Sequence, residues 1–144
     1  MNFIRLRKNN LCVENVSAIS LAKKYKTPFY CYSLSQLKSN FYNFNNAFRK
    51  TKPLICFSVK SNANIALLKE LKKIGSGADI VSAGELLKAT KAGISAKKIV
   101  FSGIGKTSEE IELAIRTKAG LISKKIEGNP TVEKPSPDKK NSDN

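Results

Sequence analysis

Three segments of the chain repeat the same order of apolar strand, short turn and amphipathic helix. The stretches "PLICFSVK", "ADIVS" and "KKIVFSG" have the composition of buried strands, and a helical pattern follows each one. They end near Lys60, Ser82 and Gly103, at steps of 22 and 21 residues. A βα unit of nearly constant length predicts an α/β fold with a parallel sheet, and strands this apolar fit a sheet buried on both faces.

Capping signals mark where the helices of these units begin. Ser82 is followed three residues later by Glu85, and Thr107 is followed in the same way by Glu110. The helix of the first unit is "NIALLKELKKI", with apolar residues at helical spacing. After the third helix the stretch "GLIS" has the composition of a short fourth strand.

The residues before the repeated units predict a different organisation. The stretch "FIRLRKNNLCVEN" predicts a small hairpin around an Asn9–Asn10 turn, and Val16–Tyr25 predicts a short amphipathic helix. The aromatic stretch "FYCYS" is strand-like. Ser33-x-x-Gln36 predicts the start of a helix over residues 34–49. The apolar stripe of that helix is expected to join the core, and it consists of Leu37, Phe41, Phe44 and Phe48.

The last part of the chain has a composition that does not support a packed core. From Lys124 onward there are three prolines and almost no large apolar residues, which is typical of disorder. We therefore expect three parts: an amino-terminal strand and helix segment over residues 1–33, an α/β part over 34–117, and a disordered or unrelated tail over 118–144.

Composition excludes several kinds of function. The 144 residues suffice for one modest domain, and 26 Lys+Arg against 11 Asp+Glu give a net charge of +15. The basic residues are mostly scattered lysines, so nucleic-acid binding is not expected as the main function. The absence of histidine removes any histidine-based triad, and the lone cysteines Cys12, Cys31 and Cys56 suggest buried free thiols rather than a metal site or disulfides. With no 18-residue apolar run and no signal-peptide pattern, a soluble cytoplasmic protein is expected.

The carboxyl ends of the predicted strands are where a ligand site is expected, because parallel α/β sheets bind ligands there. Lys60, Asn62, Ser82 and the Ser102–Gly103 pair all fall at such ends. A lysine at the end of a buried strand is expected to be partly desolvated, which favours the neutral amine that attacks aldehydes. Spacing alone, however, fits an ordinary solvated lysine at a strand tip better.

Two glycine-containing stretches do not form nucleotide-binding motifs. Gly75-x-Gly77 precedes a strand, whereas the glycines of a dinucleotide-binding fingerprint follow a strand and open a helix. The stretch "GIGKT" resembles the end of a phosphate loop, but Val100 stands where the first glycine of that loop is required. The turn is still expected to bring Lys106 near a site.

Four motifs in this order resemble a known family. "TPFYCYS", "FSVKSNAN", "GSGADIVSAGEL" and "IVFSGIGKT" are similar to the amino-terminal part of the fold-type III pyridoxal-phosphate (PLP)-dependent decarboxylases, and the opening residues favour the diaminopimelate decarboxylase branch. The resemblance covers about Phe3 to Ile115. It implies the first three to four βα units of a (β/α)8 TIM-type barrel, preceded by a short strand that belongs to a β domain.

The resemblance also implies a set of site residues. Lys60 corresponds to the lysine that binds PLP covalently, although Ser61 replaces the usual alanine of the motif. Asp79 matches an acid that lies near the cofactor, and Ser82 and Glu85 match the continuation of the same motif, so all three are expected as supporting cofactor-binding residues. No metal ligand is implied.

The implied activity is the PLP-dependent decarboxylation of meso-diaminopimelate to L-lysine by a homodimer. The family's ring-stacking histidine, glycine-rich phosphate loop, pyridine-facing glutamate and carboxyl-terminal residues have no counterpart here, so a fragment with weak or no activity alone is expected. The alternatives are an ornithine or arginine decarboxylase-like or racemase-like PLP-binding barrel, and a non-enzymatic basic binding fragment.

Overall fold

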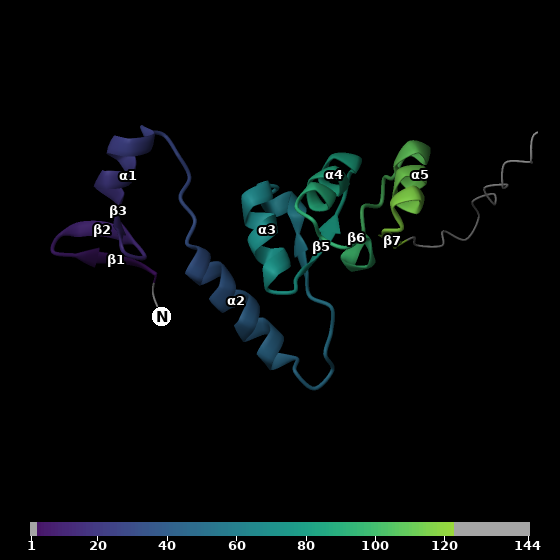
Figure 1. Cartoon of the computed structure of the whole chain (residues 1–144), viewed down its shortest axis with the longest axis horizontal. Coiled ribbons are helices and arrows are strands. Elements are labelled where there is room, and N and C mark those ends of the chain that lie inside the picture. Colours follow the sequence, from purple (N-terminus) through teal and green to yellow (C-terminus); the bar gives the residue numbers. More distant parts are fainter. Residues whose placement is uncertain (1–2, 123–144) are drawn as a thin grey trace, which may run out of the picture.

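The computed structural model describes residues 3–122, which form two small sheets and five helices (Figure 1). Residues 123–144, most of the predicted tail, lie outside the described part. The amino-terminal hairpin and first helix stand at one end of the structure, and the βα units follow one another toward the other end (Figure 1). The elements in chain order are β1 Ile4–Arg7, β2 Asn10–Val13, β3 Val16–Ser17, α1 Ala18–Tyr25, α2 Leu34–Ala47, β4 Cys56–Ser58, α3 Ile65–Lys73, β5 Gly77–Ile80, α4 Ala83–Lys91, β6 Ile99–Phe101, α5 Ser108–Thr117 and β7 Gly120–Leu121.

The amino-terminal segment forms the predicted hairpin with a turn one residue earlier than expected. β1 and β2 pair antiparallel from Ile4 opposite Val13 to Arg7 opposite Asn10, so Lys8 and Asn9 make the turn, both with positive φ. A third short strand, β3, takes the first two residues of the predicted helix. This sheet is linked to α2 by the Glu14 carboxylate, which accepts hydrogen bonds from the Ser35 amide at 2.8 Å and the Ser33 hydroxyl at 2.7 Å. These bonds hold the pKa of Glu14 below its ordinary value.

The aromatic stretch "FYCYS" is not a strand, contrary to its composition. Residues 29–33 form neither helix nor strand, and the Tyr30 side chain is 90% exposed. No neighbouring strand within the described range pairs with this segment, and β-propensity without a pairing partner does not make a strand.

Helix α2 begins as predicted but does not bury its aromatic stripe. The Ser33 hydroxyl accepts a hydrogen bond from the Gln36 amide and caps the helix. Leu37 packs on the edge of the core, whereas Phe44 is 53% and Phe48 is 46% exposed. The expectation that the whole stripe is core is therefore wrong for these two rings, which pack on each other with centroids 4.9 Å apart and remain about half exposed.

The repeated units form a parallel sheet in the order β4-β5-β6-β7, which is the order of the sequence. β7 falls inside the range expected as tail, so the sheet extends beyond residue 117 and the predicted fourth strand is present over residues 120–121. Helices α3 and α4 end before Gly75 and Gly93, whose φ values of 95° and 82° suit glycine. α5 begins with the full Thr107–Glu110 capping box.

One face of this sheet carries the hydrophobic core. Ala78, Ile80 and Phe101 are fully buried, and Ile99 is nearly so. They pack against apolar residues of the helices, such as Leu68 of α3. The strands alternate, so the side chains between these residues lie on the opposite face.

Candidate functional site at the carboxyl ends of the strands

Lys60 lies in a short 3-10 turn, Val59–Ser61, rather than at the end of a strand. β4 stops at Ser58, and Val59 is fully buried in the core, where the turn packs against β5 and α4. The buried valine therefore anchors the turn while the next residue faces outward. Lys60 is exposed and makes no hydrogen bond or ion pair with residues 3–122, so the expected partial desolvation is not observed. Its amine is accessible to a ligand.

Asp79 lies on the sheet face that is turned away from the helices. In the parallel register it stands beside Ser58 of β4 and Val100 of β6. The Ser102 hydroxyl, two residues beyond Val100, donates a hydrogen bond to the Asp79 carboxylate. This bond explains how an acid is accommodated within a strand. The sequence placed Ser102 at a strand end, but no local pattern indicated that Asp79 is its partner.

Ser58 and Cys56 extend this polar face onto β4. The Ser58 Oγ atom is buried and has no hydrogen-bond partner within residues 3–122, a situation that costs about 1–3 kcal/mol for a buried hydroxyl. Burial, and secondly the Asp79 charge, raise the pKa of the Cys56 thiol. Sequence analysis singled out neither residue for the site. We define Ser58, Asp79 and Ser102 as the polar row, since they lie on β4, on β5 and just beyond β6, which are adjacent strands.

Ser82 and Glu85 use their polar atoms at the start of α4. The Ser82 hydroxyl accepts from the Glu85 amide at 3.3 Å, which is the predicted cap. The Glu85 carboxylate accepts from the Val81 amide at 2.9 Å, one residue before the cap, instead of returning to the cap residue itself. Both side chains therefore shape the turn after β5, and in this structure neither contacts Lys60 through a hydrogen bond or ion pair.

The turn after β6 is held by two charged side chains. The Lys106 ammonium donates to the carbonyl oxygens of Gly103 and Ile122 and lies over the Phe101 ring at 5.3 Å. The Lys106 ammonium therefore uses two of its three N–H groups to hold the turn, and its expected place near a site stays a prediction. The Glu110 carboxylate accepts from the Thr107 amide and, across to the neighbouring unit, from the Ala83 amide at 2.9 Å.

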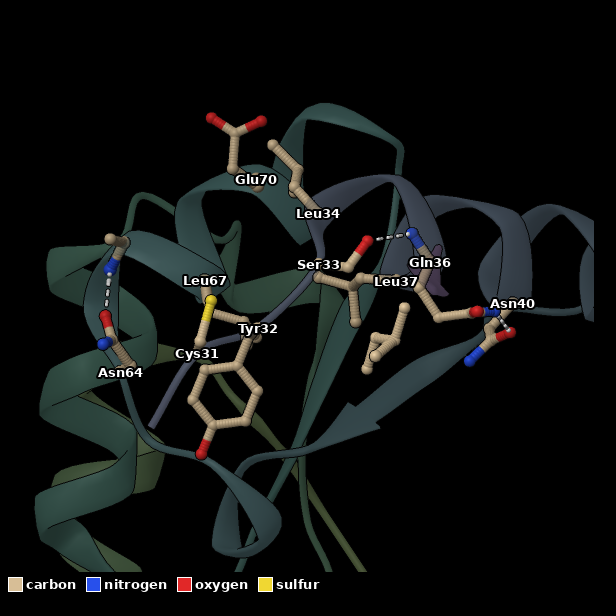
Figure 2. A pocket seen from close by; sticks show the side chains of 12 residues that line it. Cys31, Tyr32, Ser33, Leu34, Gln36, Leu37, Asn40, Asn64, Leu67 and Glu70 are labelled. Atoms are coloured by element: carbon tan, nitrogen blue, oxygen red, sulfur yellow. Dashed lines mark hydrogen bonds between the residues drawn. The ribbon is translucent and has the colours of Figure 1, made fainter. Parts of the chain in front are cut away.

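A cavity of about 500 Å³ lies elsewhere, between α2 and α3 (Figure 2). The segment from Cys31 to Leu34 lines it together with Leu37, Leu67 and Asn64. Figure 2 shows the Tyr32 ring beside Cys31, and the Glu70 carboxylate extending away from them at the edge. Glu70 is paired with Lys38 at 3.5 Å and with Lys73. None of the four predicted site residues lines this cavity.

Two further observations concern the part of the chain that the structure describes. No cluster of three or more histidine, cysteine, aspartate or glutamate side chains there could hold a metal ion. None of the helices in that part combines the length and apolar character needed to cross a membrane. Cys12 is buried as expected, but Cys31 is exposed and Cys56 only partly buried, and all three are free thiols.

The structure is thus an α/β domain with a parallel sheet, an accessible lysine just beyond β4 and an anchored carboxylate on the adjacent strand β5, at the edge where such sheets bind ligands. Comparison with known families identifies which one. The family profile of the pyridoxal-dependent decarboxylases, pyridoxal binding domain, matches residues 34–127. The chain belongs to this family.

Individual relatives agree with the family. Diaminopimelate decarboxylase of Helicobacter pylori strain J99 is 50% identical over 96 residues, which cover 67% of this chain and 24% of the relative. The enzyme of the same name from Haemophilus influenzae is 43% identical over 118 residues, 82% of this chain and 28% of the relative. The chain thus spans about a quarter of the length of the curated relatives it matches.

Solved structures share the arrangement of elements. The diaminopimelate decarboxylase of M. jannaschii, solved in co-complex with L-lysine, superposes with a TM-score of 0.78 at 35% identity, over 82% of this chain and 29% of that one. A lysine decarboxylase of Selenomonas ruminantium in a C2 crystal form, with a TM-score of 0.67 at 22% identity, shares the fold.

Proposed function

We propose that the chain forms the amino-terminal PLP-binding part of a diaminopimelate decarboxylase, which converts meso-diaminopimelate to L-lysine. The observation that carries the proposal is the accessible Lys60 amine at the carboxyl end of the first βα unit, within a chain 40–50% identical to enzymes of that name. An L-lysine complex of one structural relative supports the choice of this substrate over ornithine or arginine. Since weak or no activity is expected of this chain alone, the test of substrate is carbon dioxide release from meso-diaminopimelate compared with ornithine by the complete decarboxylase of which the chain would form the amino-terminal part.

We further propose that the βα units are the first three of a (β/α)8 barrel, with β7 beginning a fourth. Two features support this. The strands lie side by side in sequence order, whereas doubly wound sheets reverse their order at a switch point. Helices cover one face of the sheet, as on the outside of a barrel, and the polar row lies on the face that would turn inward. Residues 1–33 would precede the barrel as part of a β domain, and the family profile begins at residue 34.

The residues present fit PLP through their chemistry. PLP carries an aldehyde, which the accessible Lys60 amine can attack. Asp79, anchored by Ser102, supplies a fixed carboxylate on the adjacent strand, and the partnerless Ser58 hydroxyl supplies a further polar atom. When bound, PLP would supply an electron sink for the electron pair that stays on the substrate carbon when carbon dioxide leaves. In this proposal Lys60 holds the cofactor, Asp79 orients it, and Ser82 and Glu85 hold the turn that follows β5.

The proposal also covers the oligomeric state and the cellular compartment of the protein. A homodimer is expected, as in the resemblance, and sedimentation of the full-length chain measures it. The three free thiols favour a reducing compartment, so we place the protein in the cytoplasm. The substrate is a small amino acid.

The test is selective attachment of PLP to Lys60. The chain is titrated with PLP, reduced with borohydride and digested, and the modified lysines are identified by mass spectrometry. We expect PLP to label Lys60, and we expect this label to be absent from Lys60→Ala. The control variant Lys69→Ala, at an exposed position on α3, is expected to bind PLP as tightly as the unchanged chain. The proposal would be overturned if the label were spread evenly over the exposed lysines. It would also be overturned if the absorbance band of bound PLP were unchanged in Lys60→Ala.

A further inference from the structure

The Ser58 hydroxyl is the one side-chain oxygen or nitrogen within residues 3–122 that is buried, on a residue not itself exposed, and has no hydrogen-bond partner. Nearby serines differ from it. Ser102 donates to Asp79, Ser61 donates to the Ser58 carbonyl at 2.7 Å, and the buried Ser76 donates to the Gly77 carbonyl at 2.8 Å. Buried hydroxyls in folded proteins normally have partners, so this exception requires an explanation.

The position of Ser58 relates it to the proposed cofactor site. It is the last residue of β4, two residues before Lys60, and stands in register with Asp79 on the face turned away from the helices. Ser58 and Ser61 also line a cavity of about 420 Å³ beside α2 and α3, but neither Lys60 nor Asp79 lines it, so that cavity is not the proposed cofactor site. A buried polar atom without a partner, two residues from the proposed cofactor lysine, is suited to bind a ligand group.

Alanine in place of Ser58 would keep the strand and remove only the partnerless oxygen. If the hydroxyl served the fold, it would have a partner within the fold. A hydroxyl without a partner in the fold is free to bond with a group that arrives from outside.

We propose that the Ser58 hydroxyl is a hydrogen-bonding contact for the PLP held on Lys60. The proposal rests on the proposed function above and adds a residue to it. Ser58 and Asp79 would then bind the cofactor from adjacent strands, with Ser102 holding Asp79 in place.

The experiment compares Ser58→Ala with Ser76→Ala in the full-length chain. PLP affinity is measured by absorbance titration, and stability of the chain without PLP by urea unfolding. Ser58→Ala is expected to raise the PLP dissociation constant about five- to tenfold, the effect of one hydrogen bond, with an unchanged or higher urea midpoint. Ser76→Ala, which removes a satisfied buried hydroxyl, is expected to lower the midpoint and leave the affinity unchanged.

The outcomes separate this proposal from the one on which it rests. If the unchanged chain shows no borohydride-stable label on Lys60, the proposed function fails and the role of Ser58 fails with it. If Lys60 is labelled but Ser58→Ala binds PLP as tightly as the unchanged chain, only the role of Ser58 is overturned. A lowered urea midpoint or loss of folding in Ser58→Ala also overturns it, because the hydroxyl would then have a partner in the fold.

Discussion

The two faces of the β4–β7 sheet differ in composition although the same strands form both. On the face covered by α3, α4 and α5, Ala78, Ile80 and Phe101 are fully buried. On the other face the same strands present Ser58 and Asp79, with Ser102 just beyond β6. The covered face removes apolar surface from water and so stabilises the sheet. The other face does not have to bury apolar surface, so it can carry polar groups toward the carboxyl ends of the strands.

The largest expected effect comes from neighbouring residues on opposite faces of β6. Phe101→Ala removes a fully buried ring and should lower the free energy of unfolding by about 3–5 kcal/mol. Val100→Ala, on the partly exposed face, should lower it by less than about 1 kcal/mol. Urea unfolding of both variants measures the difference. Equal losses would mean that both faces of the sheet contribute alike to stability, which would contradict the proposed difference between them.

A second effect concerns the links between βα units. Glu110→Gln replaces a carboxylate that accepts two backbone N–H groups with an amide whose nitrogen opposes one of them. We expect a loss of about 1–2 kcal/mol in the free energy of unfolding. The control is Glu112→Gln on the same helix, which loses only an exposed ion pair with Arg116 and should change stability by no more than about 0.5 kcal/mol. Similar values for the two variants would show that the link from Glu110 to Ala83 adds little.

The smallest effect reports on the charge of the polar row. Because the Asp79 carboxylate contributes to the raised pKa of Cys56, Asp79→Asn should lower that pKa, although burial would still keep it above the ordinary value. The measurement is the pH dependence of alkylation in a Cys12→Ser, Cys31→Ser background, in which Cys56 is the remaining cysteine. At a fixed pH below the pKa, the thiolate fraction and the alkylation rate should rise in Asp79→Asn. An unchanged profile would indicate that Asp79 carries no charge near Cys56.

Local sequence patterns predicted where the helices and strands of this chain lie better than they predicted which of their side chains are exposed. The capping signals at Ser33, Ser82 and Thr107 are all observed, because a cap depends on residues three apart in sequence. The apolar stripe of α2 gave a wrong prediction of burial at Phe44 and Phe48. Periodicity predicts an apolar face of a helix but not whether another element covers that face. The prediction of a strand at "FYCYS" was wrong for a similar reason, since a strand requires a neighbouring strand that the local sequence does not reveal.

For the candidate site, the sequence placed Lys60 and Ser82 at the carboxyl ends of the first two strands, and the family resemblance named Lys60 and Asp79 as cofactor residues. It did not predict the turn that exposes Lys60, nor the bond from Ser102 to Asp79. That bond joins residues 23 apart in sequence, and it depends on the register between β5 and β6.

The sequence by itself determined the repeated βα units, the starts of their helices and the unit in which the lysine lies, because each of these follows from spacing along a single segment. Only the tertiary structure decided that Glu110 joins two units, that Lys106 binds backbone carbonyls, and that Ser58 is buried without a partner. The physical reason is that hydrogen bonds and burial between segments depend on how the strands align and which helices cover them. Those relations are formed when the sheet assembles and are not encoded in any one stretch of the chain.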